Sequence, residues 1–193
     1  EGGFRNEKHK AQWRSTLKTY AAPLWNMPVS TIGVDDVLAV LKPIWQTKPE
    51  TATRVRGRIE RVLDAAKAKK LREALQQLAE EGVVQVFTPH DGSGAIVGVV
   101  GALQLDVLAT RLDAEYGLQT RYEQSRFTVC RWITSKDPLK LKSFVVSHGS
   151  SIADDLDGAP VFMSTSAFQL NYDSERNPDI EFSDVKDYQK AAA

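Results

Sequence analysis

Residues 49–81 constrain the fold more than any other feature, because they read as a helix whose apolar face changes sides. No proline follows Pro49 within this segment. At about 100° per residue, the first apolar positions share one narrow face: Val55, Ile59, Val62 and Ala66. The later ones lie roughly 130–190° away around the helix: Leu71, Leu75 and Leu78. The segment therefore predicts contact with two separate hydrophobic cores.

Two arrangements satisfy this pattern. A continuous helix would be about 50 Å long and would join two domains as a semi-rigid spacer. A break at Lys69-Lys70 would instead give two independently tumbling domains. Both alternatives put the boundary at the same place, so we expect domains at residues 1–69 and 70–193.

The formal net charge of the 193-residue chain is zero, but that zero is a cancellation between two parts. Residues 1–70 hold 14 Lys and Arg against 7 Asp and Glu, a net charge of +7. Residues 71–193 hold 11 against 18, a net charge of −7. This asymmetry predicts that the basic part binds a polyanion and that the acidic part has a different role.

Composition narrows the class of protein. Cys130 is the only cysteine, which excludes an intramolecular disulfide and favours a reducing, cytoplasmic setting. No stretch approaches the roughly 18–20 apolar residues that span a bilayer, so we expect no membrane partner. The three histidines, His9, His90 and His148, are scattered and lack neighbours at metal-ligand spacing. We therefore expect neither a metal nor another cofactor.

Helices dominate the expected structure of the basic part, over residues 4–22, over residues 34–41 and from residue 49 onwards. A stripe of arginines lies beside the apolar face of the third helix: Arg54, Arg58 and Arg61. Each guanidinium can fork onto two phosphate oxygens, so the stripe is a candidate contact for a nucleic-acid backbone. The alternative is that these basic residues only form a solvated face.

Two motifs of the basic part carry a family resemblance: Gly3–Trp13 (GFRNEKHKAQW) and Lys48–Asp64 (KPETATRVRGRIERVLD). Residues 2–69 resemble the core-binding, SAM-like domain of phage-type tyrosine recombinases (integrases). The resemblance implies an all-helical bundle that clamps duplex DNA, with contacts from Lys10, Lys48, Thr51, Arg54 and Arg58. That family's catalytic domain, with its His-x-x-Arg motif, would follow this bundle. No His-x-x-Arg occurs after residue 70, so the resemblance does not imply catalysis.

The acidic part alternates predicted helices and antiparallel strands, which is typical of the α+β class. Helices are expected over residues 71–81, 103–116 and 139–146. Strands are expected over residues 83–87, 95–101, 119–123, 127–133, 161–164 and 168–172, the first two forming a hairpin. The loop carboxylates are expected to be plain solvated acids: Asp154, Asp155, Asp157, Asp179, Glu181 and Asp184.

Three motifs here carry a second resemblance: Glu73–Phe87 (EALQQLAEEGVVQVF), Ile96–Val107 (IVGVVGALQLDV) and Ser174–Phe182 (SERNPDIEF). Residues 71–185 resemble the C-terminal region of the bacterial release factor 3 family. The resemblance implies an elongation-factor-G-like α+β domain that contacts the ribosome or a class-I release factor. The GTPase domain of that family, with its phosphate loop and Asn-Lys-x-Asp motif, has no counterpart in this sequence.

The acidic part departs from that family before Leu71, where the family has a strand. In a split β-α-β fold such a strand lies inside the sheet, so its loss would leave unpaired edges. We therefore expect this part to be rearranged or marginally stable. The sequence as a whole predicts a non-enzymatic fusion of a DNA-binding module and a release-factor module. The alternative is a translation-termination fragment whose helical half is only a structural cap.

Overall fold

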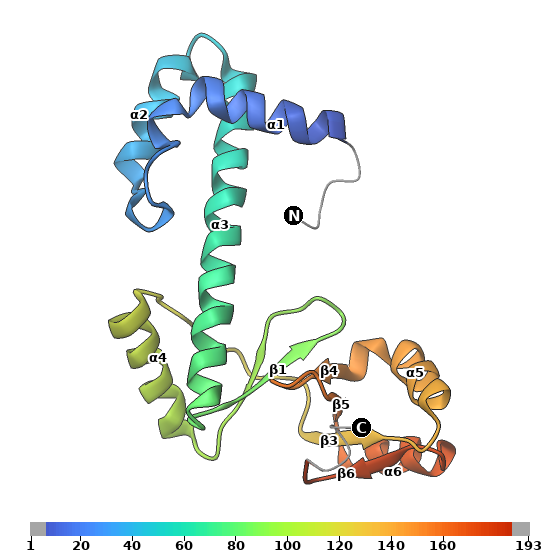
Figure 1. Cartoon of the computed structure of the whole chain (residues 1–193). Helices are drawn as coiled ribbons and strands as arrows, with labels where there is room; N and C mark the ends of the chain where they lie inside the picture. The colour runs from blue at the N-terminus through green and yellow to red at the C-terminus, as the bar shows by residue number, and fades with distance from the viewer. Residues whose placement is uncertain (1–6, 187–193) are drawn as a thin grey trace. The chain divides into compact units, whose positions relative to one another are not determined.

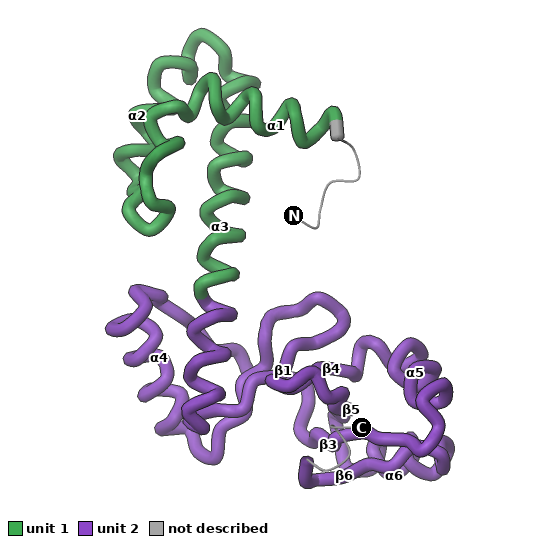
Figure 2. Tube along the Cα trace, viewed as in Figure 1, with its two compact units in different colours: residues 1–70 green, residues 71–193 purple. Residues whose placement is uncertain are grey.

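The computed structural model describes residues 7–186 and divides into two compact units, residues 1–70 and residues 71–193 (Figure 2). Residues 3–6, which begin the integrase-like motif, and residues 4–6 of the first predicted helix lie outside the described residues. None of the described helices is long and apolar enough to cross a membrane.

The first unit is helical, as expected (Figure 1). It contains α1 (Glu7–Tyr20), two short 3-10 turns (Ala22–Leu24 and Val29–Thr31), α2 (Val34–Trp45) and the first part of α3 (Pro49–Glu80). In α2, the Asp36 carboxylate accepts a hydrogen bond from the backbone N–H of Gly33 at 2.9 Å, which caps the helix N-terminus. Pro43 lies inside α2, which continues to Trp45.

The longest helix, α3, is continuous over 32 residues, so the alternative with a break at Lys69-Lys70 is wrong. Val55 and Ile59 belong to a core with buried residues of α2 and of the 3-10 turn Ala22–Leu24. Leu75 and Leu78 belong to a different core, with Leu108 and Leu112 of the next helix. These residues confirm the predicted change of the apolar face. The prediction is wrong for Val62, which is 45% exposed, and neither Val62 nor Ala66 belongs to the first core. The helix ends where Gly82 adopts a positive φ of 76°.

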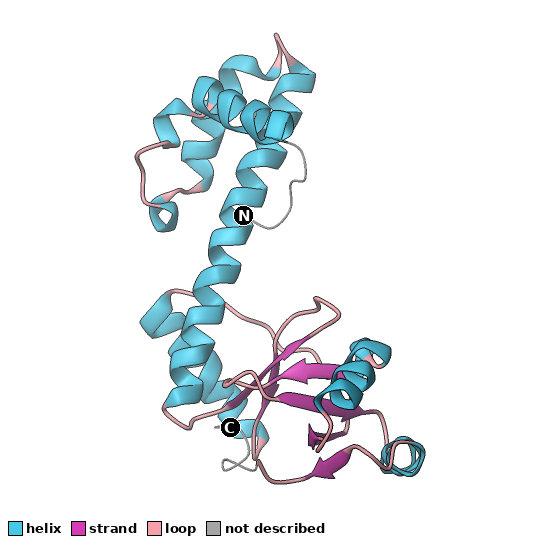
Figure 3. Cartoon of the chain, turned by 45° about the vertical axis from the view of Figure 1, so that its right-hand side comes forward, coloured by secondary structure: helices cyan, strands magenta, loops and turns pink. Residues whose placement is uncertain are grey.

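The second unit combines helices with a six-stranded antiparallel sheet, so the α+β class is confirmed (Figure 3). The strand order is β2-β1-β4-β5-β3-β6. The strands are β1 (Gln85–Pro89), β2 (Ile96–Gly98), β3 (Val129–Thr134), β4 (Ile152–Asp154), β5 (Pro160–Ser164) and β6 (Glu181–Ser183). The predicted hairpin is β1 and β2, with Val86 opposite Val97.

Helices of the second unit contribute to two of its hydrophobic cores. In one core of this unit, α4 (Ala102–Tyr116) buries Leu108 and Leu112 against the last turns of α3. A second core lies under α5 (Pro138–Ser147) and α6 (Ala167–Arg176), which cover one face of the sheet with Phe144 and Leu170. A 3-10 turn, Gly149–Ser151, follows α5.

Two predicted strands are wrong. Residues 168–172 lie within α6, because Ser166 caps a helix there. Residues 119–123 form no strand, since no neighbouring strand pairs with them in the described chain. The segment before Leu71 is helical, so the place of the strand implied by the family resemblance is taken by α3. At residues 119–123, a strand without a partner would leave its backbone groups to solvent, which explains why no strand forms there.

Candidate nucleic-acid interface

The predicted DNA-contacting residues all belong to the first unit, and most lie along α3. Lys10 is on α1, Lys48 directly precedes α3, and the remaining ones follow each other on α3: Thr51, Arg54, Arg58 and Arg61. Positions three and four residues apart share one side of a helix. The stripe from Arg54 to Arg61 thus extends for about two turns, or roughly 10 Å along the axis.

Trp13 of α1 brings two of these arginines together. The guanidinium carbon of Arg58 lies 5.3 Å from the Trp13 ring, and that of Arg61 lies 5.5 Å from it. Both distances are within the range of cation–π attraction, for which tryptophan is the best partner. His9 meets the same ring edge-on, with ring centroids 6.3 Å apart.

Sequence reasoning missed this role of Trp13, which it treated as part of the apolar face of the first helix. In the structure, Leu17 and Tyr20 pack against the core of the unit, whereas Trp13 is not among the residues packed there. Its position one turn before Leu17 could not distinguish a core tryptophan from one that stacks on arginines. The absence of an apolar neighbour at residue 9 or 10 was the available signal.

Arg58 is the most enclosed member of the stripe, with 8% of its surface exposed. Its Nη1 donates a hydrogen bond to the carbonyl oxygen of Gln12 at 3.2 Å. Burial lowers the pKa of Arg58, and the charge of Arg54 lowers it further. Arg58 therefore joins α3 to α1, and its contact with DNA stays a prediction.

Arg54 and Arg61 are exposed, in contrast to Arg58. The Arg54 side chain is 67% exposed, and its Nη2 lies 3.4 Å from a Glu50 carboxylate oxygen one turn earlier. An ion pair this exposed contributes little stability, so a phosphate can replace Glu50 as its partner at little cost. Arg61 presents its guanidinium beside Trp13 at the surface.

The other three predicted contact residues, Lys48, Thr51 and Lys10, differ in their position and exposure. The Lys48 ammonium lies 5.7 Å from the centroid of the Tyr20 ring, and Lys48 is exposed just before the first turn of α3. Thr51 is half-buried in that turn, and Lys10 is exposed on α1, one turn before Trp13. These residues flank the arginine stripe rather than extending it.

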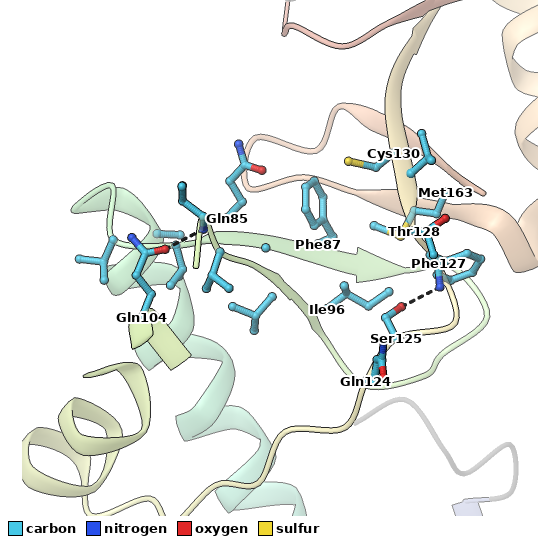
Figure 4. A pocket seen from close by; sticks show the side chains of 18 of the residues that line it. Gln85, Phe87, Ile96, Gln104, Gln124, Ser125, Phe127, Thr128, Cys130 and Met163 are labelled. Atoms are coloured by element: carbon cyan, nitrogen blue, oxygen red, sulfur yellow. Dashed lines mark hydrogen bonds between the residues drawn. The ribbon is translucent and has the colours of Figure 1, made fainter. Parts of the chain in front are cut away.

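The second unit contains a large groove of a different character (Figure 4). Its volume is about 990 Å³, and residues of β2, β1 and the segment leading into β3 line it, including Phe87, Ile96, Phe127 and Cys130. None of the described lining residues is charged. Burial raises the pKa of the Cys130 thiol, which keeps this thiol protonated at neutral pH.

The loop carboxylates are not all plain solvated acids, which corrects the prediction for Asp155. This side chain is buried, and its oxygens accept hydrogen bonds from Trp132 Nε1 at 2.9 Å and from the backbone N–H of Ala159 at 2.9 Å. Lys186 pairs with it at 2.7 Å and also with Asp157. Asp155 therefore holds a turn together. Among residues 7–186, no group of three or more His, Cys, Asp or Glu could hold a metal ion.

Comparison with known families confirms the first resemblance. The family described as "Phage integrase central domain" matches residues 1–78. This range contains α1, α2, most of α3 and therefore the whole arginine stripe.

The larger match concerns the other part of the chain. The family described as "Class II release factor RF3, C-terminal domain" matches residues 42–174. The chain belongs to this family. The match to the release factor 3 family begins before Leu71, so residues 42–78 are shared by both family matches. Neither match is to a catalytic domain.

Curated relatives agree with this family. Peptide chain release factor 3 of Bordetella pertussis is 41% identical over 128 residues, which are 66% of this chain and 24% of that protein. The release factor 3 of Nitrosomonas europaea is 35% identical over 127 residues, again 66% of this chain and 24% of the relative. The chain thus spans about a quarter of the length of these relatives.

Proposed function

We propose that the chain is a non-catalytic protein of two parts, in which residues 1–69 bind the backbone of duplex DNA. Residues 70–193 would retain a release-factor-3-type contact with the ribosome or a class-I release factor. The observation that carries the DNA proposal is the pair of exposed guanidiniums, Arg54 and Arg61, on the part of α3 that the integrase family matches.

Charge and geometry support contact with phosphates. The net charge of +7 over residues 1–70 favours a polyanion. Arg54 and Arg61 lie on one side of α3, and Trp13 fixes the position of Arg61 by stacking. Guanidinium groups held in this way bind phosphate oxygens in pairs and carry no information about base sequence. Binding is therefore expected to be strong at low salt and tolerant of sequence.

The test is a salt titration of duplex DNA binding by the full chain, measured by fluorescence anisotropy. Changing Arg54 or Arg61 to Ala should weaken binding to unrelated sequences alike and reduce the slope of log affinity against log salt by about 1. Arg72→Ala is the matched control, because Arg72 is exposed on the same helix but lies in the second unit. Equal affinities for wild type, R54A and R61A would exclude the proposal.

The second candidate function is translation termination alone, with the helical half as a structural cap. Identities of 35–41% with release factor 3 proteins favour it. Co-sedimentation of the full chain with ribosomes, compared between wild type and R54A/R61A, distinguishes the two. Ribosome binding that is insensitive to both substitutions, together with no DNA retention, would support the second candidate.

The same proposal includes the arrangement of the second unit, the lack of catalysis and the location of the protein. We infer an elongation-factor-G-like arrangement for the second unit, from its antiparallel sheet with helices on one face. Neither part is proposed to be an enzyme or to need a cofactor. Because its proposed partners are DNA and the ribosome, we propose that the protein acts in the cytoplasm and has no membrane partner.

A further inference from the structure

The apolar face of α3 extends beyond the core of the first unit. Ile59 on this face is buried, whereas Val62 on the same face is 45% exposed. Val62 lines a groove of about 320 Å³, together with other residues of α3, residues of α1 and residues within the segment 21–32. All of the described lining residues of this apolar groove are apolar, and Trp25 and Val29 among them are exposed. The first unit therefore leaves a hollowed apolar surface in contact with water.

Basic residues flank the apolar groove along α1 and α3. Each of them is exposed and lies one helical turn from a lining residue, and together they form a basic rim: Arg14, Lys18 and Lys67. Residues 21–33 contain no Asp, Glu, Lys or Arg. On α3, Glu60 pairs with Arg56 at 3.3 Å, which offsets its charge. Asp64 lies roughly 140° away from Ile59 around the helix. The groove therefore favours an occupant with apolar side chains and carboxylates beside them.

The helix α4 of the second unit has an outer face with this chemistry. The exposed residues of this face share one side of the helix: Leu103, Asp106, Val107, Thr110, Asp113 and Ala114. Leu103 and Val107 lie one turn apart and are 75% and 47% exposed. Arg111, the one basic residue of α4, lies off this face and forms ion pairs with Glu81 and Glu115, each at 2.6 Å. The outer face of α4 is thus apolar and acidic.

We propose that the occupant of the apolar groove is α4 of a second copy of the chain, which docks by its outer face as an amphipathic helix does. Leu103 and Val107 of one copy cover Trp25 and Val62 of the other, which removes apolar surface of both copies from water. The two aspartates of the outer face then lie beside the basic rim. The net charges of +7 over residues 1–70 and −7 over the rest favour this pairing between copies. The contact is heterologous, because the groove and α4 are different surfaces.

The test measures association of the full chain by sedimentation velocity at increasing concentration and low salt. Wild type should form complexes larger than the monomer. The variant L103K/V107K brings two positive charges of α4 against an apolar groove with a basic rim, so it should weaken association about tenfold or more. V62E puts a carboxylate into the groove and should weaken association in the same way. All three positions are exposed, so the fold should be kept, and thermal unfolding of each variant verifies this.

A mixture of the two variants separates this contact from one that uses the same surface of both copies. The V62E protein keeps an intact α4, and the L103K/V107K protein keeps an intact groove. An equimolar mixture should therefore form a mixed complex at a concentration at which neither variant associates alone.

Each surface has a matched control. L139K/V146K makes the same two changes as the α4 variant, at positions of α5 that are 76% and 75% exposed. V34E makes the same change as the groove variant, at an exposed position of α2 that does not line the groove. Both controls should associate as wild type does.

A wild type that stays monomeric at all concentrations would overturn the proposal. Loss of association in V62E, with L103K/V107K unaffected, would assign the groove to a different segment of the second copy. A mixture that yields no mixed complex, or a loss of association in the controls as large as in the variants, would place the contact elsewhere on the chain.

Discussion

The carboxylate of Asp155 titrates differently in the folded and the unfolded chain. Burial raises its pKa, but hydrogen bonds from Lys186, Trp132 and the Ala159 backbone outweigh burial and hold the pKa below its usual value. The folded state therefore binds this proton more weakly than the unfolded state does. A carboxyl of this kind stabilises the fold at pH values above its unfolded pKa of about 3.9, and the stabilisation is lost as the pH falls through the folded pKa.

Replacing Asp155 by Asn should remove this pH dependence and destabilise the second unit by about 1–3 kcal/mol at neutral pH. The amide group of Asn would face the Trp132 Nε1–H and the Lys186 ammonium, which both donate to Asp155 in wild type. Because the amide is neutral, it would form no ion pair with Lys186. Urea unfolding between about pH 7 and pH 3 measures both effects.

Asp157→Asn is the control for this change. Asp157 also pairs with Lys186, but its side chain is 65% exposed. Its replacement should leave the free energy of unfolding within about 0.5 kcal/mol of wild type. A D155N protein whose stability falls with acid as steeply as wild type would contradict the role assigned to Asp155.

The helix α6 shows why one element was predicted wrongly. Phe168, Leu170 and Tyr172 alternate with polar residues, which is the period of a half-buried strand. In the structure, only Leu170 of these three is buried, together with Asp173 one turn later. The two aromatic residues are exposed, and the Arg176 guanidinium lies 4.5 Å from the Tyr172 ring. The apparent alternation therefore came from surface residues, whereas the N-cap at Ser166 favours a helix.

Ser166→Ala should destabilise α6 by about 1 kcal/mol, because the Ser166 hydroxyl accepts a hydrogen bond from the Gln169 N–H. Urea unfolding measures the loss. Ser150→Ala is the matched control, since Ser150 is exposed and does not cap a long helix. Equal stabilities of S166A and S150A would show that the cap does not set the start of α6.

Elements with a local pattern could be predicted from the sequence, including the strands β3 and β5, whereas three-residue strands made only by distant pairing could not. The β1–β2 hairpin and α4 follow from turn glycines, with Gly117 ending α4 at a φ of 61°. The three-residue strand β4 was missed because it exists only through pairing with β1 and β5. In the candidate site, spacing predicted the arginine stripe. The burial of Arg58 was not predictable, because it depends on a carbonyl 46 residues away.

At the scale of the whole molecule, the two units have separate hydrophobic cores. The core of the first unit contains Ile59 of α3, and one of the cores of the second unit contains Leu78 of the same helix. A residue buried in one core makes no contribution to packing in the other, so we expect substitutions to act on one unit at a time.

Ile59→Ala and Leu78→Ala should each destabilise one unit by about 2–5 kcal/mol. The I59A protein should show a lowered unfolding transition for residues 1–70, with amide protection in the second unit unchanged. The L78A protein should show the reverse. Hydrogen exchange read segment by segment measures both, and a global loss of protection in either variant would show that the units unfold together.

Residues 64–70 of α3 lie between the parts of the helix that enter these cores. None of them is buried, and neither core includes them. Their sequence, Asp-Ala-Ala-Lys-Ala-Lys-Lys, is rich in the residues that most favour helix by themselves. Exchanging residues here for other good helix formers should therefore cost little stability in either core. At these positions the helical conformation and the number of residues matter more than packing does.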